Sequence, residues 1–98
     1  MRDYELMVVL STTLTDEQLP VSIEKISQAV SGLGGQVTDV QHGAPWGRRK
    51  LAYPIRHQRE GYYVVYRLQL DGNKSEELDR ELKLNEDVLR HLLTRVEG

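Results

Sequence analysis

The segment "GYYVVYRLQL", Gly61–Leu70, carries the strongest β-strand signal in the chain, and the fold is predicted outward from it. Its residues alternate with a period of two, which is typical of a strand that packs one face on a core. One face holds Tyr62, Val64, Tyr66, Leu68 and Leu70, and the other holds Tyr63, Val65, Arg67 and Gln69. We expect the first face to be buried, because it carries no charged side chain.

The segments around this strand predict two helices and three further strands. Apolar residues at intervals of three and four predict a helix from about Thr15 to the glycines at 32–35, and a short acidic helix runs from Ser75 to Leu84. Strands are predicted at Tyr4–Leu10 and at residues 36–42, and residues 50–55 are predicted to be extended. The segment "VLRHLLTRV" fits a helix or a strand by periodicity, but a second β-α-β unit requires a strand there.

This order predicts an α+β fold, the ferredoxin-like β-α-β-β-α-β sandwich. A four-stranded antiparallel sheet is expected to carry two helices on one face and to leave the other face open. The length of 98 residues fits one two-layer core, so residues 1–98 are predicted to form a single domain.

Several local signals refine this prediction. Thr15 and Gln18 have the spacing of a capping box, but Pro20 suggests that the helix begins a residue or two later than the box. Ser75 is a candidate N-cap of the second helix. Val37 and Val40 lie three residues apart, which predicts a bulge in their strand.

Pro54 cannot donate a backbone hydrogen bond, so it is predicted to lie at a sheet edge or in a bulge. Such an edge is a candidate surface for a partner protein. Leu51, Tyr53 and Ile55 alternate along the same segment, and we expect them to anchor it to the core.

Composition excludes several classes of site. The chain has no cysteine, which rules out disulfides, thiolate metal sites and cysteine nucleophiles. It lacks a run of about 20 apolar residues to span a bilayer, and Asp3 and Glu5 interrupt the start where a secretory signal needs apolar residues. We therefore expect a soluble cytoplasmic protein without a membrane contact.

No arrangement of residues points to an enzyme. The histidines His42, His57 and His91 are scattered without carboxylates at metal-ligand spacing, and the glycine motifs of nucleotide-binding and serine-hydrolase sites are missing. The same topology occurs in a phosphatase resembling acylphosphatase, but the first loop here, residues 11–18, lacks the arginine and glycines that its site needs. We expect no catalytic residue, metal, cofactor or small-molecule substrate.

Charge is distributed unevenly along the chain. Residues 42–68, the basic segment, contain six cations and one acid, a net charge of +5 in a protein of net charge −2, so the rest carries −7. A basic surface on an acidic domain favours an oriented approach to a polyanion.

The candidate RNA-binding residues are Arg2, Trp46, Arg48, Arg49, Lys50, Arg56 and Arg59. Cations can bind phosphates and aromatic rings can stack on bases, which favours RNA, but charge that protects an exposed strand explains the same composition.

The segment "GRRKLAYPIR", Gly47–Arg56, resembles the signature of the bacterial small ribosomal subunit protein six family. The similarity extends to "MRDYELMVVL" at the start, to "EGYYVVYRL" from Glu60 and to "LDRELKLNEDVLRHLLTRV" from Leu78, so it covers essentially the whole chain. The resemblance implies a β-α-β-β-α-β fold, no catalytic activity, and a structural role in the ribosome. It also implies binding to central-domain small-subunit rRNA together with a partner, small-subunit protein eighteen.

Two alternatives remain open at this point. One is a free RRM-like module for single-stranded RNA, which has the same topology. Its third-strand motif needs stacking rings at places that here hold Tyr62, Val64 and Arg67, so the register argues against it. The other is a protein-interaction module without RNA contact, which would leave the basic segment unexplained.

Overall fold

The computed structural model describes residues 1–43 and 47–96. The elements in these residues are β1 (Arg2–Ser11), α1 (Gln18–Gly32), β2 (Gln36–Gln41), β3 (Gly47–Ile55), β4 (Gln58–Leu70), the 3-10 helix η1 (Gly72–Lys74), α2 (Ser75–Leu84) and β5 (Val88–Arg95). The described helices include none that is long and apolar enough to cross a bilayer.

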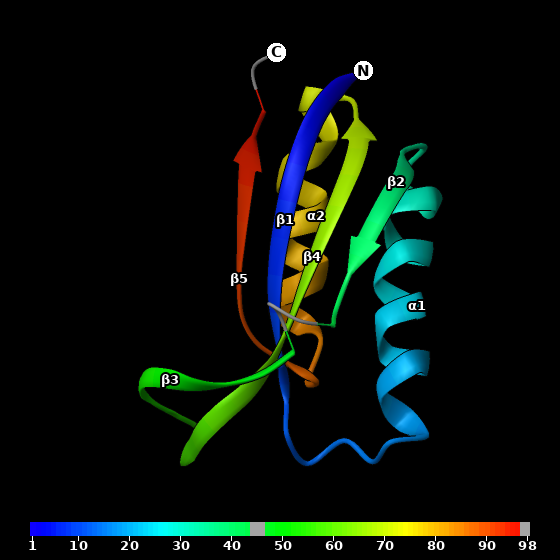
Figure 1. The fold of residues 1–98 in the computed structure, drawn as a ribbon. Helices are drawn as coiled ribbons and strands as arrows, with labels where there is room; N and C mark the ends of the chain where they lie inside the picture. The colour runs from blue at the N-terminus through cyan, green and yellow to red at the C-terminus, as the bar shows by residue number, and fades with distance from the viewer. Residues whose placement is uncertain (44–46, 97–98) are drawn as a thin grey trace.

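The strands form one antiparallel sheet with the order β2-β4-β1-β5, and β3 pairs with β4 as well. The long strand β4 has β1 along one side, while β2 and then β3 occupy its other side (Figure 1). The predicted ferredoxin-like fold is therefore confirmed, with one correction. The sheet has five strands instead of four, because the extended segment after β2 pairs with β4 as a separate strand.

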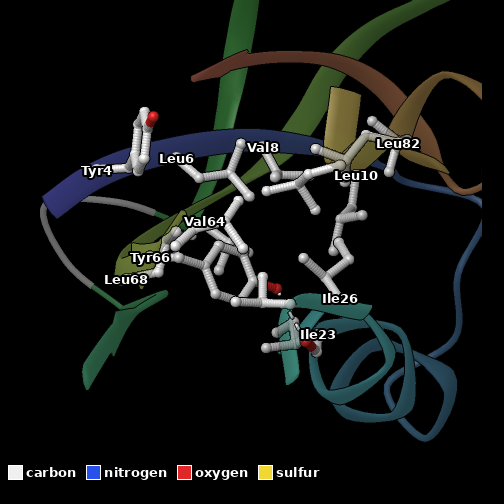
Figure 2. Close-up of a cluster of buried hydrophobic side chains, with 14 residues drawn as sticks. Tyr4, Leu6, Val8, Leu10, Ile23, Ile26, Val64, Tyr66, Leu68 and Leu82 are labelled. Atoms are coloured by element: carbon white, nitrogen blue, oxygen red, sulfur yellow. Dashed lines mark hydrogen bonds between the residues drawn. The ribbon is translucent and has the colours of Figure 1, made fainter. Parts of the chain in front are cut away.

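The core lies between one face of the sheet and both helices. The sheet contributes alternate residues of β1 and β4 to this core, and the helices contribute residues of α1 and α2 (Figure 2). The contributing residues of β1 are Tyr4, Leu6, Val8 and Leu10, and those of the helices are Ile23, Ile26, Val30, Leu78 and Leu82. The Tyr66 hydroxyl donates a hydrogen bond of 2.9 Å to the Ile23 carbonyl, so its one polar atom is satisfied inside the core. Burial raises the pKa of Tyr66 above its ordinary value. The predicted inward face of the central strand is confirmed.

The capping box at the start of α1 forms as predicted. The Thr15 amide donates to Gln18 Oε1 at 3.0 Å, and the Gln18 amide donates to Thr15 Oγ1 at 3.2 Å. The helix itself begins at Gln18, so Pro20 falls in its first turn, where backbone N–H groups need no partner within the helix. After the helix, Gly34 has a φ of +83°, a conformation that glycine adopts without steric cost.

Both predicted irregularities of the sheet are present. The register of β2 shifts between Val37 and Asp39, which lets Val37 and Val40 both pack against the core. The register of β3 shifts between Lys50 and Ile55. Pro54 lies inside this shift, where a missing N–H costs no ladder hydrogen bond.

The prediction that Ser75 caps α2 is wrong. Ser75 is already the first residue of the helix, and its hydroxyl donates to the Gly72 carbonyl at 2.9 Å. The 3-10 helix η1 directly precedes α2, so Ser75 already has helical conformation. Its side chain therefore bonds back to η1 instead of capping α2. The last strand is confirmed as β5, and its first residue, Val88, is buried in the core.

Candidate nucleic-acid interface

The cations of the basic segment gather on a twisted hairpin at one end of the sheet. We call residues 47–63, the whole of β3 and the start of β4, the basic hairpin. It bends away from the rest of the sheet, at the opposite end from both chain termini (Figure 1). Arg48, Arg49, Lys50, Arg56 and Arg59 all lie on it and are exposed.

Strand alternation distributes three adjacent cations over two faces of the basic hairpin. Arg48 lies opposite Tyr62 and Arg49 lies opposite Gly61 in the β3–β4 register. The Arg48 guanidinium lies 5.9 Å from the Tyr62 ring centre, and that of Arg49 lies 5.7 Å from the ring centre of Tyr63, the next residue of β4. Since Tyr62 and Tyr63 face opposite ways, the hairpin presents positive charge on both sides.

Arg48 also has an intramolecular ion pair. Its Nη2 and Nε atoms both lie 2.9 Å from Oε2 of Glu60, and this hydrogen-bonded carboxylate raises the pKa of Arg48. Both side chains are well exposed, so the pair is screened by water and contributes little to stability. A phosphate could therefore compete with Glu60 for this arginine.

The structure gives the remaining cations of the basic hairpin different surroundings. Within residues 1–43 and 47–96, no ion pair engages Arg49, Lys50 or Arg59. Arg56 instead donates from Nη1 to the Glu86 carbonyl at 2.8 Å, and from Nη2 to the Val88 carbonyl. Three hairpin cations are thus available to an outside anion, and a fourth is occupied by backbone acceptors.

The structure does not bring Arg2 together with these residues. Arg2 pairs with Leu70 at one end of β4, whereas Gly61, opposite Arg49, lies nine residues away along the same strand. Nine residues of strand span about 30 Å. Arg2 and the basic hairpin would therefore contact separate parts of any single ligand. Trp46, the predicted aromatic contact, lies outside the described residues.

A groove of about 690 Å³ follows the bulged part of β3. Its lining combines cations and small apolar groups: Thr12, Arg48, Lys50, Leu51, Ala52, Tyr53, Pro54, His57, Gln58, Arg59 and Glu60. The expectation that Tyr53 anchors this segment to the core is wrong, because the residue is 57% exposed. The bulge breaks the alternation that would have turned its ring inward.

Sequence reasoning missed Arg90 of β5. Arg90 pairs with Val9, which in turn pairs with Tyr63, so the arginine lies across β1 from the tyrosine that Arg49 covers. Its Nη1 atom also donates to the Tyr53 hydroxyl at 3.4 Å. Arg90 is far from Tyr53 and Tyr63 in sequence, and only the pairing of the strands brings it near them. The sequence therefore carried no signal that Arg90 belongs to this surface.

In the part of the chain that the structure describes, the arrangement has neither a metal site nor the ring platform of an RRM. Among the residues that the structure describes, no group of three or more acidic or histidine side chains could hold a metal ion. Val64 is 1% exposed, and Tyr62 packs against the core. Only Tyr63, of the three aromatic residues at 62, 63 and 66, lies on the open face.

The fold and the basic hairpin together define a class: a small ferredoxin-like domain that presents positive charge on a protruding hairpin. The chain belongs to the ribosomal protein S6 family. The model of this family matches residues 3–95. It is accordingly a structural, non-enzymatic protein of the small ribosomal subunit, and its place is the ribosome, which is cytoplasmic in bacteria.

Individual relatives agree along almost the whole chain. Small ribosomal subunit protein bS6 of Moorella thermoacetica is 40% identical over 97 residues, covering 99% of this chain and 96% of the relative. The corresponding protein of Dictyoglomus turgidum is also 40% identical over 97 residues, covering 99% and 97%. The crystal structure of 30S ribosomal protein S6 from Thermotoga maritima matches with a TM-score of 0.87 at 25% identity, covering 97% of this chain and 87% of that one.

Proposed function

We propose that this chain binds the central domain of small-subunit rRNA through the basic hairpin, together with small-subunit protein eighteen. The observation that carries the proposal is the concentration of exposed cations on one protruding hairpin of a protein with a net charge of −2. The acidic remainder would repel a polyanion from the other surfaces and orient its approach. Membership of a small-subunit protein family supports rRNA as the polyanion.

The proposed phosphate contacts are Arg48, Arg49, Lys50 and Arg59. All four are exposed, and three of them have no ion pair in the described part of the chain. Arg2 is a proposed contact to a separate stretch of rRNA, because it lies at the far end of the sheet. Trp46, adjacent in sequence to the basic hairpin, is proposed to pack on a ribose, a base or the partner protein.

The proposed partner surface is the bulged edge of β3 and the open sheet face beside it. Residues 51–54 fall within the register shift, and Tyr53 is 57% exposed. Leu92 is also 57% exposed, and it lies on the same side of β5 as Arg90. Arg90 in turn donates a hydrogen bond to the Tyr53 hydroxyl. Exposed apolar side chains next to a loosely paired strand edge are typical of a protein interface. Hydrogen exchange in the complex that leaves residues 51–54 and Leu92 unprotected would contradict this assignment.

The RNA contact is tested by the double substitution Arg48→Ala and Arg49→Ala. Loss of two phosphate contacts should weaken binding to a central-domain rRNA fragment, measured with the partner protein present, by about tenfold or more near physiological salt. The melting temperature should change little, because both side chains are exposed.

The matched control is the double substitution Lys25→Ala and Arg80→Ala. It removes the same charge from exposed positions on α1 and α2, outside the basic hairpin. The control should bind nearly as well as the unmodified protein. Equal losses in both variants would show that net charge alone drives binding, and no loss in the hairpin variant would remove Arg48 and Arg49 from the site.

A further inference from the structure

The turn at the tip of the basic hairpin has an unfavourable backbone conformation. Arg56 and His57 connect β3 to β4 with φ angles of 47° and 64°. Two successive residues of positive φ make the two-residue turn that suits the twist of a hairpin, but they usually require glycine or asparagine. Neither residue is of that type, so other contacts must hold the turn in place.

Arg56 supplies such contacts outside the hairpin. Its two Nη atoms donate to the carbonyls of Glu86 and Val88, which flank the start of β5. The planar guanidinium can bridge two acceptors that are two residues apart, whereas a lysine ammonium is a single point of attachment. The side chain thus fastens the hairpin tip to the connection between α2 and β5.

Gln58 supplies a second attachment, to the end of β1. Its Oε1 atom accepts hydrogen bonds from the Thr12 amide at 3.0 Å and the Thr12 hydroxyl at 3.2 Å, and its Nε2 atom donates to Ser11 Oγ at 2.8 Å. The Ser11 amide in turn donates to the Asp87 carbonyl at 2.8 Å. The second attachment therefore reaches the segment before β5 indirectly, through Ser11, whereas Arg56 reaches it directly.

We infer that Arg56 is a positioning residue whose guanidinium latches the basic hairpin to the start of β5. The latch fixes the direction in which the phosphate-binding cations point, and Arg56 itself does not contact RNA. Its donors toward Glu86 and Val88 are already engaged, whereas Lys50 and Arg59 have no side-chain hydrogen bond or ion pair within residues 1–43 and 47–96. The RNA part of this inference rests on the proposed function, while the latch itself is a property of the free protein.

The free protein tests the latch with the substitution Arg56→Lys, which keeps the charge and loses the two-point bridge. Amide hydrogen exchange followed by NMR should accelerate about tenfold or more at residues 55–60, because charge-assisted hydrogen bonds are lost. Exchange at the core residues Val64 and Tyr66 should stay unchanged, which shows that the fold is intact. The control Arg59→Lys should alter neither set. Unchanged exchange at residues 55–60 in the Arg56→Lys variant would overturn the latch.

RNA binding over a salt series separates positioning from phosphate contact. The probe is a central-domain fragment of small-subunit rRNA with the partner protein present. The Arg59→Ala variant should reduce the log–log salt slope by about 0.7 to 0.9, the effect of one lost phosphate contact. The Arg56→Ala and Arg56→Lys variants should lower affinity several-fold at an unchanged slope.

The possible results have distinct meanings. A slope reduced by Arg56→Ala as much as by Arg59→Ala, with hairpin exchange unaltered, would make Arg56 a phosphate contact and overturn the inference. Absence of RNA binding by the unmodified protein would instead contradict the proposed function. The exchange measurement would still decide whether the latch exists, since it needs no RNA.

Discussion

At the scale of single residues, Gly61 shows how closely the base of the basic hairpin is packed. A Cβ atom at Gly61 would lie 2.3 Å from Cγ1 of Val9, a buried and branched side chain on the neighbouring strand. Val9 has few rotamers with which to withdraw. Glycine at position 61 therefore lets β1 and β4 approach where the hairpin leaves the sheet.

We expect Gly61→Ala to destabilise the protein by about 1 to 3 kcal/mol, the usual cost of overpacking a filled site. Urea unfolding followed by circular dichroism measures this loss. The control is Gly32→Ala at the end of α1, where a Cβ would meet nothing within 4 Å, and it should be neutral or slightly stabilising. Equal stability of the Gly61→Ala variant and the unmodified protein would show that the strands can separate there at little cost.

The residue scale also shows what charge patterns in the sequence can predict. They located the cations of residues 48–59 correctly as a group, because neighbours in sequence on one hairpin stay neighbours in space. They could not single out Arg56, since its acceptors are backbone carbonyls thirty residues or more away. They likewise missed Arg90, which reaches the site only through the register of β1 with its neighbours.

At the scale of elements, α2 is joined to β5 through the carboxylate of Asp79. His91 Nε2 lies 2.6 Å from Oδ1 of Asp79, and Lys83 Nζ lies 3.0 Å from Oδ2 of the same carboxylate. These hydrogen bonds, first from His91 and then from Lys83, lower the pKa of Asp79 below its ordinary value. The ionised carboxylate thus ties the acidic helix to the edge strand.

The sign of this pKa shift determines its effect on stability. A carboxylate whose pKa is lower in the folded than in the unfolded protein stabilises the fold above the unfolded value of 3.8, and this contribution is lost as pH falls through the folded value. We expect Asp79→Asn to cost about 1 kcal/mol or less at pH 7, since the carboxylate is partly exposed. The difference from the unmodified protein should shrink in acid below about pH 4.

Unfolding free energies from pH 2.5 to 7 measure this effect. Glu81→Gln on the same helix is the control, because Glu81 is exposed and has no ion pair among the described residues. A difference between Asp79→Asn and the unmodified protein that stays constant over this range would show that the ionised carboxylate is not the source of the stabilisation.

Most elements could be predicted from the sequence because their signals are local. The alternation of residues 61–70, the apolar spacing of α1 and the capping box all depend on nearby residues. The pairing of the extended segment as a fifth strand, β3, could not be predicted, because it depends on the length of β4, whose 13 residues offer one edge to both β2 and β3. The exposure of Tyr53 follows from the same pairing and was missed with it.

Across the whole molecule, charge is distributed with a clear polarity. The exposed cations of the basic hairpin lie at one end of the sheet, and both termini lie at the other (Figure 1). Outside the basic hairpin, four acids, Glu76, Glu77, Asp79 and Glu81, lie together on α2. The net charge of −2 does not reveal this polarity. The net charge of +5 on residues 42–68 predicted it.

The salt dependence of rRNA binding is the sharpest test of this polarity. With the partner protein present, the four proposed hairpin contacts should contribute about −2.8 to −3.6 to the log–log slope of affinity against salt. Affinity should then fall about fifty-fold or more for a fourfold rise in salt, and removing Arg48, Arg49, Lys50 and Arg59 together should reduce the slope by about that contribution. A slope near zero for the unmodified protein, or one unaffected by the loss of these four cations, would show that the basic hairpin does not bind rRNA phosphates.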